Sequence, residues 1–398
     1  MPIPPALPAA LAARGPWRLA AGLAIALAGL VLAAWLGVRI APAVQAGLLF
    51  FNDSTAQWSF ARFAMELPAA RLYDADALHA FQRSLYPKLA HTFPYPYPPH
   101  YLFAVWPLGW LDPHWVWPIW SGATLALFLL AAAPGRPWEA ALLALAPTSI
   151  VAFAYGQNGF LTSALILGGL RLLPHRQGLA GLLLGLATIK PQLGLLIPVA
   201  LLAAGQWRAL ATASATVAAM VVLSALAFGW ETWPLFLATL TGHAGAIAGW
   251  VSDYRKATIA ANLTLAGLPR DLADIAQWAL AAAMAALVWS SFRRGITPER
   301  IALLIAAGFV ATPYAFLYDL PMLAAAALLL ARDRKLPWPE AAVLAAALLF
   351  PLAAVMTSRL YWMTGVSLVA LLALAWWRSR KEGSSFSEEK EAKRLSSL

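Results

Sequence analysis

The stretch LAAGLAIALAGLVLAAWLGV, residues 19–38, decides the fold class, because it runs without a charge over a length that crosses a bilayer. Arg14 and Arg18 form a basic flank before it. The run exceeds the roughly 7–15 apolar residues of a secretory signal. We therefore predict an uncleaved membrane anchor whose N-terminal end lies in the cytoplasm.

The composition extends this interpretation to the whole chain. Of its 398 residues 61% are hydrophobic and 12% are charged, against roughly 25% charged in a soluble domain. A soluble core stops growing near ~250–300 residues and cannot bury so much apolar surface. These values exclude a soluble enzyme, a nucleic-acid-binding protein and a disordered chain. The absence of cysteine excludes disulfides, thiolate catalysis and Cys-based metal sites.

Further apolar runs predict an all-α polytopic membrane protein with about 12 transmembrane helices. We expect residues 1–378 to form one transmembrane domain and residues 379–398 to form a disordered cytoplasmic tail. The predicted cores are 17–40, 113–133, 137–154, 160–173, 178–189, 191–204, 208–229, 270–291, 299–312, 316–331, 337–356 and 361–378. The fifth and sixth of these are also compatible with one long broken helix.

The net charge of +10 is read as an orientation signal, because cytoplasmic loops of membrane proteins are enriched in Lys and Arg. With the N-terminus inside and alternating spans, 18 of the 28 cations fall on the cytoplasmic side. This parity requires that residues 99–111 do not span. Two outer segments, 41–112 and 230–269, are too long to be simple turns, and long loops in compact folds are usually functional.

Asp53 follows the first span and a strongly apolar stretch. A carboxylate at an apolar boundary is desolvated, which suits it to act as a general base near neutral pH. The alternative is a capping role for the helix that Ser54 begins. The two roles are compatible only if the carboxylate still faces a cavity.

Lys190 interrupts the apolar run 178–204 and is followed directly by Pro191 and Gln192. A lysine inside a span needs a partner or a polar cavity, and a broken helix with one Lys is a candidate phosphate site. The alternative is snorkelling to the surface. Asp319 lies between Pro313 and Pro321, and it is either a functional intramembrane acid or a structural partner of Lys190.

The remaining candidates are polar or aromatic residues of the predicted outer side. Each has a structural alternative: an interfacial aromatic belt, a helix–helix turn, or a solvated loop charge. As substrate-binding residues we predict Tyr97, His100, Gln157, Asn158, Gln192, Tyr314, Tyr318 and Asp319, and as donor-phosphate-binding residues Lys190, Arg255 and Lys256.

Nucleotide-binding motifs and the HExxH zinc motif are absent from the sequence. It contains no P-loop, no GxGxxG, no GxSxG and no HExxH. We therefore expect a metal-free reaction without a cofactor, and a donor that is not a nucleotide in a Rossmann domain.

Six short motifs in this order resemble glycosyltransferase family 87, polytopic GT-C enzymes that use a polyprenyl-phosphate-linked hexose, often mannose. Each motif alone is weak, but the resemblance runs over nearly the whole chain. The motifs are Asp53 after the first span, Leu72-Tyr73-Asp74, Tyr97-Pro98-Pro99, Gly156-Gln157-Asn158-Gly159, Lys190-Pro191-Gln192, and Thr312-Pro313-Tyr314 followed by Tyr318-Asp319-Leu320.

The resemblance implies Asp53 as the catalytic base of an inverting transfer. Many members place an aromatic residue after this Asp, whereas Ser54 follows here and Trp58 stands nearby. The implied partners are a polyprenyl-phosphate hexose donor, a lipid or glycan acceptor, and the bilayer. The implied location is the inner (cell) membrane, with both termini cytoplasmic and the active site extracytoplasmic.

A transporter or flippase is the main alternative. It would need buried charges on several helices and internal repeats, whereas the charges that interrupt apolar stretches of this chain most clearly are Lys190 and Asp319, and two outer loops are long. A ligase that acts on a protein or a larger glycan would be expected to carry a soluble C-terminal domain.

Overall fold

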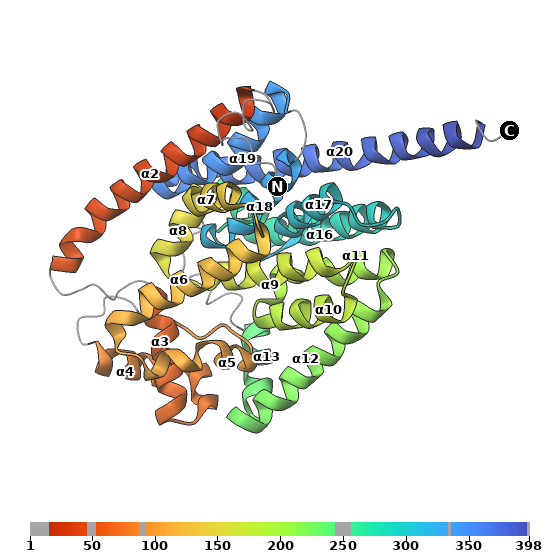
Figure 1. Ribbon diagram of the computed structural model, residues 1–398. Coiled ribbons are helices and arrows are strands. Elements are labelled where there is room, and N and C mark those ends of the chain that lie inside the picture. Colours follow the sequence, from red (N-terminus) through yellow and green to blue (C-terminus); the bar gives the residue numbers. More distant parts are fainter. Residues whose placement is uncertain (1–15, 46–52, 87–91, 243–255, 333–335, 396–398) are drawn as a thin grey trace, which may run out of the picture.

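The computed structural model describes residues 16–45, 53–86, 92–242, 256–332 and 336–395, and within these ranges the chain forms helices and no strand (Figure 1). The one β-type pairing among them is an isolated antiparallel bridge between Lys256 and Phe316. The predicted all-α fold class is thus confirmed.

Each predicted apolar core corresponds to helical structure, but the number of membrane crossings is not confirmed. Three helices of the described ranges are long and apolar enough to cross a bilayer: α6 (Pro113–Ala132), α12 (Trp207–Phe228) and α16 (Arg270–Phe292). The pair α7 (Pro137–Leu145) and α8 (Pro147–Tyr155), bent by 65°, makes a fourth if it is one broken span.

The other cores form helices that are shorter or only partly apolar. They are α2 (Pro16–Gln45), α9 (Gly159–Leu172), α10 (Gln177–Leu186), α11 (Ile197–Ala203), α17 (Pro298–Ala311), α18 (Pro321–Ala331), α19 (Trp338–Met356) and α20 (Trp362–Leu395). Between α10 and α11 the chain forms two 3-10 turns, η4 (Ala187–Ile189) and η5 (Pro191–Gly194), separated by Lys190. Pro191 has no N–H for a continuous helix, so the cores 178–189 and 191–204 are separate.

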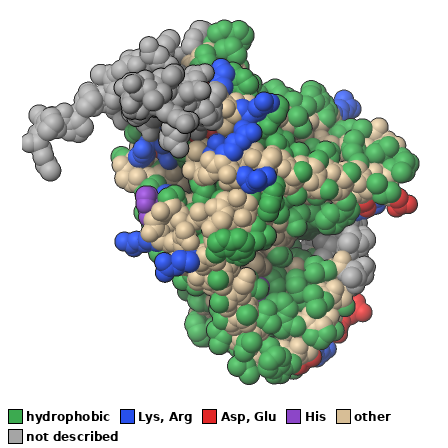
Figure 2. Space-filling model, turned by 90° about the vertical axis from the view of Figure 1, so that its right-hand side faces the viewer, with side chains coloured by type: hydrophobic (Ala, Val, Ile, Leu, Met, Phe, Trp, Pro, Cys, Tyr) green, Lys and Arg blue, Asp and Glu red, His purple; other side chains and the backbone are tan. Residues whose placement is uncertain are grey.

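The surface carries many apolar side chains, as expected for a protein in lipid. Leu226 and Ile275 are 66% and 65% exposed on α12 and α16. Hydrophobic side chains cover much of the face seen in Figure 2, where Lys and Arg gather toward its upper part. A soluble monomer rarely exposes such large apolar areas, and the chain is a membrane protein.

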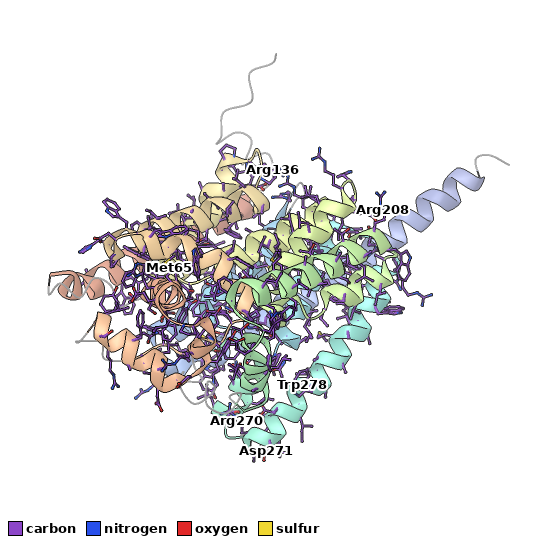
Figure 3. All side chains as sticks on the ribbon, turned by 90° about the horizontal axis from the view of Figure 1, so that it is seen from below. Met65, Arg136, Arg208, Arg270, Asp271 and Trp278 are labelled. Carbon is purple, nitrogen blue, oxygen red and sulfur yellow. The ribbon has the colours of Figure 1, made fainter. Side chains whose placement is uncertain are left out.

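Charged residues at helix ends lie on opposite sides of the molecule. Arg136 and Arg208 come from the predicted inner loops, and Arg270 and Asp271 begin α16 at the predicted outer side. Figure 3 shows these two pairs at opposite sides of the view. The arrangement is compatible with the alternation of loops that the charges predict.

The first long loop folds into a compact group at one end of the bundle, beside α13 (Thr232–Gly242) and one end of α12 (Figure 1). Phe60, Phe63, Leu72 and Tyr101 belong to its own apolar core. Residues 99–111 form three short helices and not one span, as the predicted parity requires. The group contains α3 (Asp53–Glu66), η1 (Ala69–Tyr73), α4 (Ala75–Leu85), η2 (Pro99–Tyr101), α5 (Leu102–Val105) and η3 (Trp106–Trp110).

The main core is centred on α17 and α18, which are buried over most of their length. Just before α18, η7 (Leu317–Asp319) passes beside α8 and α9, and α15 (Ile259–Leu265) packs on α16. This packing brings the Thr312–Asp319 segment against the turn that joins α8 to α9.

The C-terminal segment differs from its prediction. Helix α20 continues to Leu395 and projects from the body of the molecule (Figure 1), so the described part of the predicted disordered tail is helical. The Glu, Lys, Arg and Ala residues between 388 and 394 are strong helix formers.

Candidate active site

Asp53 is the first residue of α3, and its side chain is half-buried. A carboxylate at a helix N-terminus is stabilised by the helix dipole and by the backbone N–H groups there. The start of a helix at this point is therefore confirmed. The Asp53 side chain is not fully buried. It can therefore begin the helix and still be accessible to a substrate.

A hydrogen-bond chain of buried side chains ends at Asp53. The Nε2 of Gln157 donates to Asp53 Oδ2 at 2.8 Å. The Oε1 of Gln157 accepts from Gln57 Nε2 and from the Tyr97 hydroxyl, both at 3.2 Å. The Tyr101 hydroxyl donates to Gln57 Oε1 at 2.6 Å. Side chains from three segments of the chain thus form one network, and Gln157 connects that network to Asp53 Oδ2.

The turn that carries Gln157 depends on two glycines. Gly156 ends α8 with φ of +66°, and a Cβ there would lie 2.7 Å from the Cβ of Ser54. A Cβ on Gly159, the first residue of α9, would lie 2.0 Å from the carbonyl oxygen of Tyr318. The glycines therefore let this turn touch α3 on one side and η7 on the other.

On the η7 side, Lys190 and Asp319 form a buried ion pair. The distance from Lys190 Nζ to Asp319 Oδ1 is 2.6 Å, and the side chains are 3% and 0% exposed. Lys190 Nζ also donates to Asn158 Oδ1 at 3.2 Å and lies 4.9 Å from the ring centre of Tyr318. Asp319 Oδ2 accepts from the Phe316 N–H at 3.0 Å. These contacts favour the predicted alternative in which Lys190 and Asp319 pair with each other, and the phosphate role of Lys190 stays a prediction.

Residues Gln157 and Asn158 connect the two carboxylates, since one amide contacts Asp53 and the next contacts Lys190. Tyr97 lies between them: burial raises the pKa of its hydroxyl, and the charges of Asp53 and Asp319 raise it further. The charges of both carboxylates also act on two further tyrosines. The structure thus gathers Asp53, Tyr97, Gln157, Asn158, Lys190, Tyr314, Tyr318 and Asp319.

His100 occupies a different part of the same region. It is buried, its ring stacks on Trp233 of α13 at 5.9 Å between centres, and its Nε2 lies 3.4 Å from Thr188 Oγ1. Its Nδ1 has no hydrogen-bond partner in the described part of the chain. Burial lowers the pKa of His100 to about 4, so the ring is neutral at physiological pH.

The remaining predicted site residues are Lys256, Arg255 and Gln192. Lys256 is buried, and its backbone bridges Phe316 while the Ala257 N–H donates to the Ala315 carbonyl at 2.8 Å. Arg255 lies outside the described residues. Gln192 is half-buried on η5 and makes none of the contacts above.

Sequence reasoning did not single out Gln57 or Tyr101 as site residues. Gln57 is fully buried and follows Asp53 by four residues, so it lies on the same face of α3. That spacing was the available signal. Tyr101 was hidden among many aromatic residues, and only the packing of η2 against α3 reveals its contact with Gln57.

Comparison with known proteins gives one result. No curated protein and no solved structure matches the chain. The model of a family described as glycosyltransferase family 87 matches residues 95–317, which is more than half of the chain and includes the Gly156–Gly159 turn, Lys190 and Tyr314. This chain therefore belongs to glycosyltransferase family 87.

Proposed function

We propose that this membrane glycosyltransferase moves a hexose, mannose in the first instance, from a polyprenyl-phosphate donor to a lipid or glycan acceptor. The site would lie on the extracytoplasmic side of the cell membrane, in a GT-C-like bundle with cytoplasmic termini. The observation that supports this most is Asp53, a half-buried carboxylate that begins α3 and accepts a hydrogen bond from Gln157.

In the proposed reaction Asp53 takes the proton of the acceptor hydroxyl. The acceptor oxygen then forms a bond to the anomeric carbon while the bond from that carbon to the phosphate oxygen breaks, with inversion. The lipid phosphate leaves with the bonding electrons. A phosphate is a good leaving group, so the transfer needs no second acid.

Cations would stabilise the phosphate as its negative charge grows. We assign this role to Lys256 and to Arg255, the residue before it, which lies outside the described residues. Lys256 is buried beside the Thr312–Asp319 segment, and its backbone is fixed by the bridge to Phe316. Lys190 takes part less directly, because its ammonium already contacts Asp319, Asn158 and the Tyr318 ring.

The hexose would lie among Tyr97, Tyr314 and Tyr318, whose rings can stack on its apolar face. Tyr314 and Tyr318 are half-buried, and both rings pack on Phe316, at 4.8 Å and 5.0 Å between ring centres. The isoprenoid tail would run between helices in the bilayer, and His100 and Gln192 stay predicted substrate-binding residues.

The test compares two carboxylates of the same loop in a reconstituted assay with radiolabelled polyprenyl-phosphate mannose and extracted lipids. Asp53→Asn removes the base, and we expect transfer to fall about 10²–10⁴-fold. Asp74→Asn is the matched control: Asp74 is exposed and its side chain caps α4, and Asn caps equally well. Wild-type transfer in Asp53→Asn would remove Asp53 as the base.

The donor class is tested in the same membranes with polyprenyl-phosphate glucose and a nucleotide sugar in parallel. Transfer only from the nucleotide sugar would overturn the proposed donor class. Uptake of lipid-linked sugar into vesicles without any glycosyl product would favour the transporter alternative.

A further inference from the structure

The hydrogen bonds around Asp53 have a single direction. An ionised carboxylate only accepts hydrogen bonds, so Gln157 must turn its NH₂ group toward Asp53. Its Oε1 must then face Gln57 Nε2 and the Tyr97 hydroxyl, and Gln57 must turn its own oxygen to Tyr101. Every donor in this series of hydrogen bonds therefore points along the series toward Asp53.

We propose that Gln157, oriented by Gln57 and Tyr101, is a positioning residue that holds the Asp53 carboxylate aligned and ionised for the acceptor proton. This inference rests on the proposed function, because it assumes that Asp53 is the base. It changes the predicted role of Gln157 from sugar binding to the support of Asp53, and it adds Gln57 and Tyr101 to the site.

Burial makes this orientation exclusive. Gln57 and Tyr101 are 0% exposed and Gln157 is 8% exposed, so little water can replace a lost partner. A flipped Gln157 amide would set its oxygen against the carboxylate oxygen and its NH₂ against that of Gln57. Both contacts would be repulsive. The Tyr101 hydroxyl, as the last donor, prevents the same flip at Gln57.

The backbone of Gln157 is fixed from the other side. Asn158 accepts from Lys190 at 3.2 Å, and Lys190 is held by Asp319. Gly156 and Gly159 are in close contact with α3 and with the backbone of η7. These contacts fix the position of the Gln157 backbone. A rigid support of a carboxylate requires such a fixed backbone.

Any effect on proton affinity must be judged against the other titratable groups near Asp53. Tyr97, Tyr314 and Tyr318 are the groups on which its charge acts directly, and the Lys190–Asp319 pair lies beyond the turn. The titratable groups on α3 and on the elements that pack against it, capping residues included, are Arg62, Glu66, Arg71, Tyr73, Asp74, Asp76, His79, Arg83, His100, Tyr101, Asp112 and His114. Of these only Tyr101 is changed in the variants below.

The experiment measures kcat/KM against pH, and the KM for polyprenyl-phosphate mannose, in the reconstituted enzyme. Gln157→Leu keeps the approximate size and removes the donor. We expect its acid limb to move up by about one pH unit, because the carboxylate loses a hydrogen bond to its charged form. We expect kcat to fall about 10–100-fold from misalignment, with KM changed less than about twofold.

Two further variants should shift the acid limb by a larger and by a smaller amount than Gln157→Leu. Gln157→Glu keeps the shape but sets a second carboxylate beside Asp53, so the acid limb should move up further than in Gln157→Leu. Tyr101→Phe removes only the last donor and should give a smaller shift in the same direction. Tyr95→Phe is the matched control: its buried hydroxyl donates to the Pro98 carbonyl at 3.3 Å in the same aromatic cluster, outside the chain that ends at Asp53.

The outcomes separate this inference from the proposed function. A raised KM with an unshifted acid limb in Gln157→Leu would show sugar binding and overturn the positioning role. A shift in Tyr95→Phe equal to that in Tyr101→Phe would also overturn it. If Asp53→Asn retains transfer, the proposed base itself fails, whatever the Gln157 variants do. Should Gln157→Leu misfold, the pH profiles of Gln157→Glu and Tyr101→Phe decide the question.

Discussion

The two carboxylates on either side of the Gly156–Gly159 turn are held in opposite ways. Asp53 is half-buried at a helix start and contacts a neutral amide, whereas Asp319 is fully buried and contacts an ammonium 2.6 Å away. The first accepts a hydrogen bond from an uncharged side chain. The second belongs to a buried ion pair with Lys190.

This difference teaches how one turn can serve chemistry and stability together. In the proposed reaction Gln157 supports the carboxylate that reacts, whereas Asn158 contacts a buried ion pair. The amides of Gln157 and Asn158 therefore contact two charged groups for which we propose different roles. The variants below test whether the two sides are as distinct as their contacts indicate, beginning with the largest expected effect.

Removing one partner of the buried pair should have the largest effect on stability. Lys190→Met leaves Asp319 charged, buried and uncompensated, and we expect a loss of about 3–5 kcal/mol. The double variant Lys190→Met/Asp319→Leu removes both charges and should recover most of that loss. Thermal unfolding in lipid nanodiscs measures both variants.

Transfer activity of the double variant then decides between anchoring and phosphate binding. If the ammonium only anchors the turn, the well-folded double variant keeps most of its transfer rate. A stable double variant without activity would contradict the division into a reactive side and an anchoring side.

The pH dependence of stability should come from His100, which is buried as a neutral ring beside Trp233 and Thr188. Its pKa is about 4 when folded and ~6.5 when unfolded. As pH falls from ~6.5 to ~4 the unfolded chain gains a proton that the folded chain does not. On the order of 3 kcal/mol of stability is therefore lost over that range and is fully present above it.

The measurement is the unfolding midpoint between pH 7 and pH 4 for wild type and for His100→Gln. The variant has no titrating ring, so its midpoint should fall less steeply with pH. Parallel curves for the two proteins would assign the acid sensitivity to another group.

The smallest effect is expected from a change in the turn itself. A methyl group at Gly159 would lie 2.0 Å from the Tyr318 carbonyl oxygen, so Gly159→Ala must push η7 away from α9. Overpacking of this kind costs about 1–3 kcal/mol. Because the turn touches both sides, Gly159→Ala should lower transfer as well as stability.

Gly122→Ala in α6 is the control for this variant. It adds the same methyl group to a helix position with nothing within 4 Å, and it should leave both quantities near wild type. Equal losses in the two variants would mean that the methyl group acts through general packing and not through the turn.

The helices were predictable from the sequence, because apolar runs and prolines are local signals, and lone intramembrane charges pointed to side chains that the structure brings together. The boundaries of α6 and α12 and the break at Pro191 follow from such signals. The sequence left two interpretations of Asp319 open, a functional acid or the partner of Lys190. It could not decide between them, because the pairing depends on how the segment before α18 packs.

Gln57 could not be recognised by type alone, because a glutamine on a helix is ordinarily solvated. Its burial arises only when η2 and the Gly156–Gly159 turn close over α3. The helical segment beyond residue 378 was also missed, because a polar composition is compatible with a helix as well as with disorder.

The packing of α2 has a consequence for how the protein is made. Helix α2 precedes the other described helices in the chain, and it packs against α7, α8 and also α19, which is synthesised much later than α2 (Figure 1). This part of the membrane domain can therefore close only when α19 has been inserted. A chain arrested before α19 would keep one face of α2 open to lipid or to chaperones, and quality control could recognise it there.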